Sequence, residues 1–171
     1  MFEIQELIKM FCDDPSESRP YLRQPFTIKG KTYFTDGRSI IWFENEVWNY
    51  PLEHAPNIDK ILEGLNFTYK TGWLPIPDEL PEDETNVCPE CNGNGWRYCG
   101  ECGSEIDCQE CDNGQITIMK TIEIGLGVFA TKQLKKFKIF NNVLIHPFAD
   151  YRIVPIKFDG GYGAIMPCRK E

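Results

Sequence analysis

Residues 88–114 read CPECNGNGWRYCGECGSEIDCQECDNG and contain six of the eight cysteines in a chain of 171 residues. The six form three Cys-x-x-Cys pairs, Cys88/Cys91, Cys99/Cys102 and Cys108/Cys111. A Cys-x-x-Cys turn directs two thiolates at one metal ion, and two such turns complete the tetrahedral site that zinc prefers. The sixteen residues between the outer pairs fall within the spacing typical of zinc sites. We therefore predict a small zinc module with Zn²⁺ as its cofactor.

The number of zinc ions stays open, because six thiolates can hold one zinc with a spare pair or two zincs that share sulfurs. A disulfide framework is the first competing interpretation. It is disfavoured because the N-terminus lacks the basic region of a secretion signal. A redox Cys-x-x-Cys is the second, and it normally occurs singly on a βαβ scaffold. Cys12 and Cys168 have no partner at ligand spacing, so we expect them to be small buried apolar groups.

The segment Cys88-Pro-Glu-Cys91-Asn-Gly-Asn-Gly95 resembles the Cys-x-x-Cys-x-Gly-x-Gly repeat of the cysteine-rich zinc domain in DnaJ-type co-chaperones. Residues 108–114 are similar to a degraded copy, and Cys99-Gly-Glu-Cys102-Gly looks like the knuckle of a zinc ribbon. That family carries four repeats, whereas this chain has three pairs. The resemblance implies metal binding with outer ligands at Cys88, Cys91, Cys108 and Cys111. Co-chaperone function does not follow, because the chain has no J-domain signature.

Charge is distributed unevenly along the chain, whose formal net charge is −8. Residues 78–112 contain eleven acidic residues and one basic residue, whereas residues 115–171 contain nine basic and four acidic residues. The net charge argues against a protein that coats nucleic acid with its whole surface. The shift in composition near Pro75 to Pro81 divides the chain into residues 1–80, a zinc-binding insert at 81–114, and residues 115–171.

Periodicity predicts an α+β fold in which two similar halves flank the zinc insert. Each half reads as a helix followed by short strands, and we expect the two halves to pair into one sheet. The first half has expected helices at 2–11 and 57–65 and strands at 25–28, 32–35 and 39–43. The second half has an expected helix at 131–137 and strands at 116–124, 142–146, 151–158 and 162–167.

A second resemblance covers most of the chain outside the cysteines. Ser18-Arg-Pro-Tyr-Leu22 and Tyr33-Phe-Thr-Asp-Gly-Arg38-Ser-Ile40 look like the Arg-x-x-Leu strand and the following turn of bacterial-type DNA sliding clamps. Ala164-Ile-Met-Pro-Cys-Arg169 is similar to the end of a clamp chain. The resemblance implies a single clamp-like domain built from two helix-plus-strands halves. Clamp chains carry two or three such domains and no zinc module, so this chain departs from the family in both respects.

The clamp resemblance also implies helices that line a DNA-sized hole. In the expected helix at 131–137, Lys132, Lys135 and Lys136 share one face because they recur at i, i+3 and i+4. We predict that these lysines bind DNA phosphates, with a solvated lysine face as the alternative. The N-terminal helix carries Glu3, Glu6 and Lys9 and is expected to be a poor surface for DNA.

The functional prediction is a zinc-binding, non-enzymatic accessory protein of DNA replication or DNA processing, encoded by a phage or mobile element. No phosphate-binding loop, nucleophile elbow or His-Glu-x-x-His motif indicates an enzyme. The implied partners are double-stranded DNA, replication proteins and further copies of the chain in a homo-oligomer. No apolar run approaches the roughly 20 residues needed to cross a bilayer, so we expect a cytoplasmic protein without a membrane partner. The alternative is a protein-interaction adaptor whose acidic zinc module docks a partner.

Overall fold

A seven-stranded antiparallel sheet forms the centre of the computed structural model, which describes residues 3–12, 19–44, 47–52, 56–147 and 153–169. The strand order is β1-β2-β3-β13-β12-β11-β4. The strands are β1 (Phe26–Ile28), β2 (Lys31–Thr35), β3 (Ser39–Phe43), β4 (Leu74–Pro75), β11 (Leu144–Ile145), β12 (Val154–Phe158) and β13 (Gly161–Ile165). In the middle of the sheet β3 pairs with β13, with Ile41 opposite Gly163. The chain segments before and after the cysteines therefore share one sheet, as expected.

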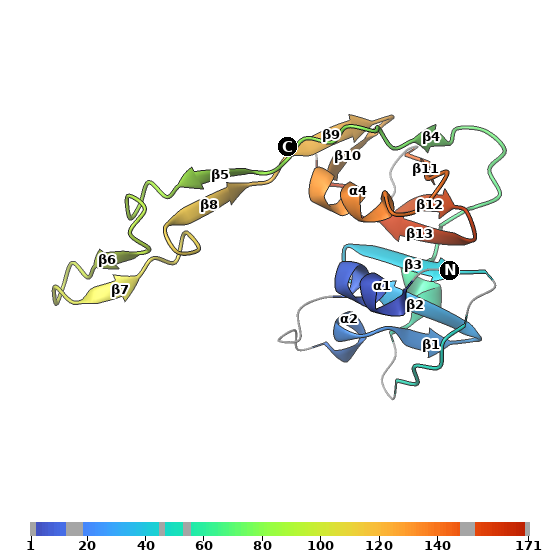
Figure 1. Cartoon of the computed structure of the whole chain (residues 1–171), viewed down its shortest axis with the longest axis horizontal. Helices are drawn as coiled ribbons and strands as arrows, with labels where there is room; N and C mark the ends of the chain where they lie inside the picture. Colours follow the sequence, from blue (N-terminus) through green and yellow to red (C-terminus); the bar gives the residue numbers. More distant parts are fainter. Residues whose placement is uncertain (1–2, 13–18, 45–46, 53–55, 148–152, 170–171) are drawn as a thin grey trace.

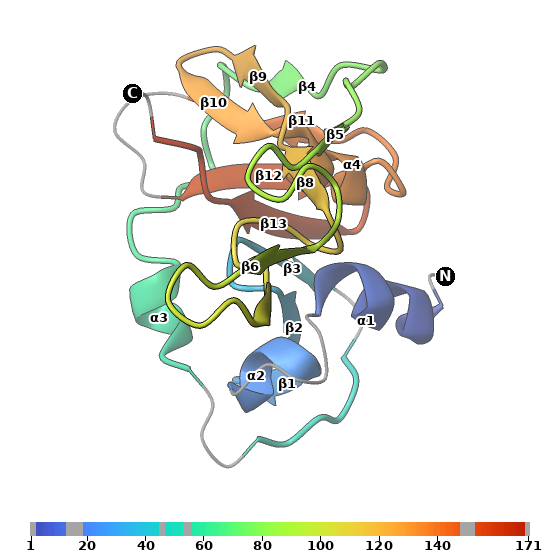
Figure 2. The same ribbon diagram turned by 90° about the vertical axis from the view of Figure 1, so that its left-hand side faces the viewer.

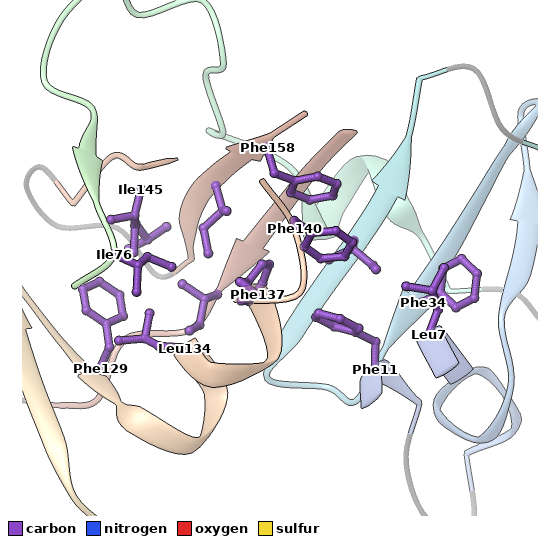
Figure 3. Packing of buried hydrophobic residues seen from close by; sticks show 14 of the residues in the cluster. Leu7, Phe11, Phe34, Ile76, Phe129, Leu134, Phe137, Phe140, Ile145 and Phe158 are labelled. Carbon is purple, nitrogen blue, oxygen red and sulfur yellow. The ribbon is translucent and has the colours of Figure 1, made fainter. Parts of the chain in front are cut away.

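The two halves of the sheet repeat one order of elements. Helix α1 (Ile4–Phe11) precedes the meander β1–β2–β3, and helix α4 (Thr131–Phe137) precedes the meander β11–β12–β13. Both helices lie on the same side of the sheet (Figure 1). The ring of Phe11 meets the ring of Phe137 edge-on at a centroid distance of 5.3 Å, so the helices share one core (Figure 3). The predicted α+β class is confirmed.

Both faces of the central strands are buried. On the helix face, Phe34, Ile41 and Ile165 join the cluster around α1 and α4. On the opposite face, Ile40 and Trp42 pack with Ile58 of helix α3 (Ile58–Ile61). Alternate side chains of a strand point to opposite faces, which explains why β3 is an unbroken apolar run. Among the described helices, none is long and apolar enough to cross a bilayer.

The cysteine-rich segment leaves the sheet as a long arm (Figures 1 and 2). Strand β5 (Glu84–Val87) pairs with β8 (Gln115–Ile118), and Glu84 lies opposite Ile118. At the far end, β6 (Trp96–Tyr98) and β7 (Glu105–Asp107) form a second hairpin. At the base of the arm, the backbone N–H of Lys120 donates to Asp83 Oδ1 at 2.9 Å. The arm therefore leaves and re-enters the body at one place.

The expected single strand at 116–124 is wrong. The strand is interrupted at Met119 and Lys120: β8 belongs to the arm, whereas β9 (Thr121–Ile124) pairs with β10 (Gly127–Ala130). The carbonyl of Lys120 accepts from the N–H of Thr131 at 3.0 Å, in register with the β9–β10 pairing, whereas its N–H donates to the side chain of Asp83. Lys120 therefore marks the point where the chain passes from the arm to the body.

Two local expectations also differ from the structure. The clamp resemblance implies a strand at Arg19–Leu22, but Pro20–Arg23 form the single-turn helix α2. Pro20 is the first residue of this helix, where its fixed φ suits the helical conformation and where no helical hydrogen bond needs its missing N–H. The helix expected at 57–65 is shorter, because Gly64 adopts a φ of +83° just beyond α3. Ser18 of the clamp-like motif and Tyr151 at the start of the expected strand 151–158 lie outside the described residues.

Asp36 connects the two halves through a largely buried ion pair. Its Oδ1 accepts the backbone N–H groups of Arg38 at 2.9 Å and Ser39 at 2.7 Å, which shapes the β2–β3 turn. Its Oδ2 pairs with Lys136 Nζ of α4 at 2.5 Å, and the two side chains are only 8% and 19% exposed. Burial opposes ionisation of Asp36, but the hydrogen bond and charge of Lys136 outweigh it and hold the pKa of this carboxyl below its usual value.

We expect Asp36→Asn to lower the free energy of unfolding at neutral pH by about 2 kcal/mol, because the turn acceptor remains but the charge opposite Lys136 is lost. A carboxyl whose folded pKa is depressed stabilises the fold above its unfolded pKa of about 3.9, and this contribution disappears as pH falls through the folded value. Wild type and variant should therefore converge in acid. Urea denaturation at neutral and acidic pH measures both effects.

The matched control for this variant is Asp59→Asn, which removes the carboxylate of the exposed Lys29–Asp59 pair. An exposed pair contributes less than about 1 kcal/mol, so this change should have little effect at either pH. Equal losses in the two variants would contradict a special role for the buried pair.

A second prediction concerns the arm. Replacing residues 84–118 with a short Gly/Ser linker should leave the body folded, because Glu84 and Ile118 are cross-strand neighbours at the base. The midpoint of thermal unfolding should change by less than about 5 °C, and the transition should stay cooperative. Near-ultraviolet circular dichroism of the body aromatics reports the transition. A shortened chain without a cooperative transition would show that the body needs the arm in order to fold.

Candidate metal centre and basic groove

Four cysteines lie close together between the two strand pairs of the arm, β5–β8 and β6–β7. Cys88 and Cys91 follow β5, and Cys108 and Cys111 precede β8. Their four sulfur atoms all lie within 4.8 Å of one another, with Cys88 Sγ 3.9 Å from Cys108 Sγ and Cys91 Sγ 3.6 Å from Cys111 Sγ. A tetrahedron with zinc–sulfur bonds of about 2.3 Å has sulfur–sulfur edges of about 3.8 Å. The four thiols are therefore positioned to bind one metal ion, with the all-sulfur ligand set that suits zinc.

The backbone of the two metal-binding turns is interlocked. The N–H of Cys88 donates to the carbonyl of Gly114 at 2.8 Å, and the N–H of Cys108 donates to the carbonyl of Gly95 at 2.8 Å. Each turn thus supports the first cysteine of the other. Gly114 has a φ of +86°, and a Cβ on it would lie 2.0 Å from the carbonyl oxygen of Gly93. Only glycine fits at this crossing of the two turns.

The metal-free thiols differ in acidity. Burial disfavours the thiolate of Cys91, but a hydrogen bond from the N–H of Gly95, 3.3 Å from its sulfur, and contacts with Cys111 and Cys88 lower its pKa to about 7. Burial and the neighbouring thiols of Cys108 and Cys91 raise the pKa of Cys111 to about 12. Metal binding requires thiolates, so uptake of zinc here releases protons to solvent.

The structure does not bring Cys99 and Cys102 to this group. Both lie in the turn between β6 and β7 at the far end of the arm, where Cys102 is exposed and Cys99 half-buried. Hydrogen bonding with the side chain and backbone of Ser104 lowers the pKa of Cys102 to about 7. Cys12 is buried in the core as expected, whereas Cys168 is only half-buried. His146 packs against the rings of Tyr69 and Trp73, and it is not among the clustered metal ligands of the described residues.

A groove of about 910 Å³ lies between α1 and α4 on the body. Its walls include six basic residues from four parts of the chain and one acidic residue, Asp36. The basic residues are Lys9 of α1, Arg23 of α2, Arg38 of the β2–β3 turn, and Lys132, Lys135 and Lys136 of α4. The lining of this groove therefore carries an excess of positive charge.

The three lysines predicted from sequence all line the groove, but they are not equivalent. Lys132 is exposed, Lys135 pairs with Glu82 Oε1 at 2.5 Å, and Lys136 pairs with the buried Asp36. Changing Lys136 to an acid would therefore place two carboxylates together in the core, so it does not test phosphate binding. Gln133, beside them, is buried and its Oε1 lies 3.4 Å from Ser39 Oγ.

Sequence reasoning missed the groove residues of the first half. Lys9 comes from a helix that the pattern marks as a poor DNA surface, yet neither Glu3 nor Glu6 lines the groove. Arg23 and Arg38 reach it from a short helix and a turn. No spacing in the sequence signals this convergence, because it depends on how the two halves meet across the sheet.

Comparison of the chain with protein-family models, with curated proteins and with solved structures finds no match.

We predict that Gly114→Ala weakens zinc binding by roughly 10- to 100-fold, because a Cβ at a strained, positive φ also collides with the Gly93 carbonyl. The control is Gly100→Ala, since a Cβ at Gly100 meets nothing within 4 Å. Competition with a chromophoric chelator measures both affinities. Equal zinc affinity in the two variants would contradict the interlocked geometry.

Proposed function

We propose that this protein is a non-enzymatic accessory factor of DNA replication or processing, which holds the phosphate backbone of DNA in the groove between α1 and α4. The observation that carries the proposal is the gathering of six basic side chains around one groove in a chain with a net charge of −8. Phosphate attraction depends on the local field, so a basic groove attracts DNA even where the rest of the surface is acidic.

The arrangement of the halves supports a clamp-like interpretation of this groove. Each half carries one long helix followed by three strands, the halves join through their third strands, and the two helices lie side by side. In the clamp-like interpretation these helices present one continuous surface to DNA. Lys9 from the first helix and Lys132 from the second lie on that surface.

The groove residues have different parts in this proposal. Lys9, Arg23 and Lys132 are exposed, so they supply phosphate contacts. Lys135 exchanges its exposed partner Glu82 for a phosphate at little cost, because surface ion pairs are weak. Lys136 keeps Asp36 and holds α4 in place. Zinc in the four-cysteine group keeps the arm folded and takes no part in chemistry.

The second candidate function is a protein-interaction adaptor, and the surface of the arm favours it. Tyr98 and Ile106 near the far end are 63% and 41% exposed, and they lie within the strongly acidic segment 78–112. Exposed apolar residues surrounded by like charges are typical of a docking surface for a basic partner. The experiment below separates the two candidates.

We expect the wild-type chain to bind duplex DNA at about 50 mM salt, where long-range attraction is least screened. The variant Lys9→Glu/Arg23→Glu/Lys132→Glu should lose this binding, because three phosphate contacts are replaced by repulsion. Together with Lys135, the wild type makes four phosphate contacts, which give a slope of log affinity against log salt of about −3.6. Fluorescence anisotropy of a labelled duplex over a salt series measures both quantities.

The matched control is Lys31→Glu/Lys60→Glu/Lys70→Glu, which makes the same change in net charge at exposed positions outside the groove. It should retain most of the affinity and the salt slope. Equal loss in both triple variants would indicate unspecific attraction rather than a groove. A wild-type chain that ignores DNA at this salt would remove the DNA proposal and leave the adaptor.

A further inference from the structure

The third cysteine pair, Cys99 and Cys102, is placed differently from the other two. It lies in the six-residue connection between β6 and β7, at the end of the arm farthest from the sheet (Figure 1). Cys102 is exposed, with its Sγ 3.4 Å from Ser104 Oγ, and Cys99 is half-buried. The pair therefore reaches solvent at the far end of the arm.

This turn is built like a metal-binding turn. The N–H of Gly103 donates to the carbonyl of Cys99 at 2.9 Å, and the N–H of Cys99 donates to the carbonyl of Ser104 at 2.8 Å. The residue after the second cysteine has a positive φ, +68° at Gly103, as it does after Cys91, where Asn92 has +52°. The turn thus has the hydrogen bonds and the backbone conformation of a Cys-x-x-Cys metal-binding turn, and such a turn supplies two of the four thiolates of a tetrahedral site.

The described part of this chain does not supply the other half. Only the four-cysteine group brings three or more ligand side chains together among the described residues. The remaining cysteines, Cys12 and Cys168, belong to the body, where Cys12 is buried in the core and the N–H of Cys168 donates to Val128. Glu101, Glu105 and Asp107 are near in sequence, but they do not complete a ligand group with the two thiols.

We propose that Cys99 and Cys102 are half of a second zinc site, which the same pair from a second copy of this chain completes. The four-cysteine group shows within one chain how two Cys-x-x-Cys turns meet, each supporting the other through reciprocal backbone hydrogen bonds. A two-fold contact between two arm ends repeats that arrangement between chains, because such a contact uses the same residues on both sides. The site is incomplete without the partner copy.

The charge and polarity of the arm end determine how this pairing behaves. Glu101, Glu105 and Asp107 outnumber Arg97, so two arm ends repel each other without a metal ion. Tyr98 and Ile106 flank the thiols and offer apolar surface that pairing can bury. The dimer therefore requires the metal, and it strengthens as salt screens the repulsion. DNA binding has the opposite salt dependence.

The test is a zinc titration of the full chain under a non-thiol reductant, followed by sedimentation equilibrium. About one equivalent of zinc should bind to each chain at the four-cysteine group without a change in mass. A further half equivalent, to about 1.5 per chain, should then bind as the mass doubles. The doubling should disappear on chelation and should be more complete at 0.5 M than at 0.05 M salt, concentrations at which the screening length differs by roughly threefold.

The decisive variant is Cys99→Ser/Cys102→Ser, which should keep the first equivalent, lose the half equivalent and stay monomeric. Cys168→Ser is the control and should behave like the wild type in both steps. Three results would overturn the proposal. The second step could reach two zinc ions per monomer, or the double-serine variant could double in mass. The wild type could also stay monomeric with zinc at both salt concentrations. The first binding step reports the four-cysteine site independently, and none of these outcomes depends on DNA binding.

Discussion

The antiparallel pairing of β3 with β13 is the contact on which the rest of the structure depends. It joins the two meanders into one sheet, and it brings α1 and α4 onto the same face, where Phe11 meets Phe137. The buried Asp36–Lys136 pair then connects a turn of the first half to a helix of the second. Because the basic groove draws its walls from both halves, it exists only when this strand pair is formed.

The most accurate predictions from the sequence were those that depend on residues close together in the chain. Cys-x-x-Cys spacing marked three pairs as candidate zinc ligands, and the structure brings together two of them, Cys88/Cys91 and Cys108/Cys111, but not Cys99/Cys102. The helix at 131–137 was also predicted with its correct bounds, since Leu134 and Phe137 mark its buried side. Local periodicity and spacing carry enough information for elements of this kind.

Features that depend on contacts between distant segments could not be read from the sequence. The break before Lys120 separates a strand that pairs with β5 from one that pairs with β10, and the different environments of Lys135 and Lys136 arise from Glu82 and Asp36. The sequence of α4 alone gives no reason to expect different environments for Lys132, Lys135 and Lys136. Its members acquire different properties when other segments place carboxylates beside two of them. For the same reason, the sequence did not predict that Lys9, Arg23 and Arg38 line the groove.

The position of the arm has a consequence for the order in which the chain folds. Ile41 and its partner Gly163 are 122 residues apart, so the central strand pair cannot form until β13 has left the ribosome. Cys88 and Cys111 are separated by only 23 residues, so the four thiols can meet, and the arm can close, much earlier. Once closed, it holds Asp83 beside Lys120 and removes the intervening segment from the loop that β3 and β13 must close. Capture of a metal ion by these four thiols during synthesis would therefore lower the entropic cost of joining the two halves, and metal supply would influence how quickly the body folds.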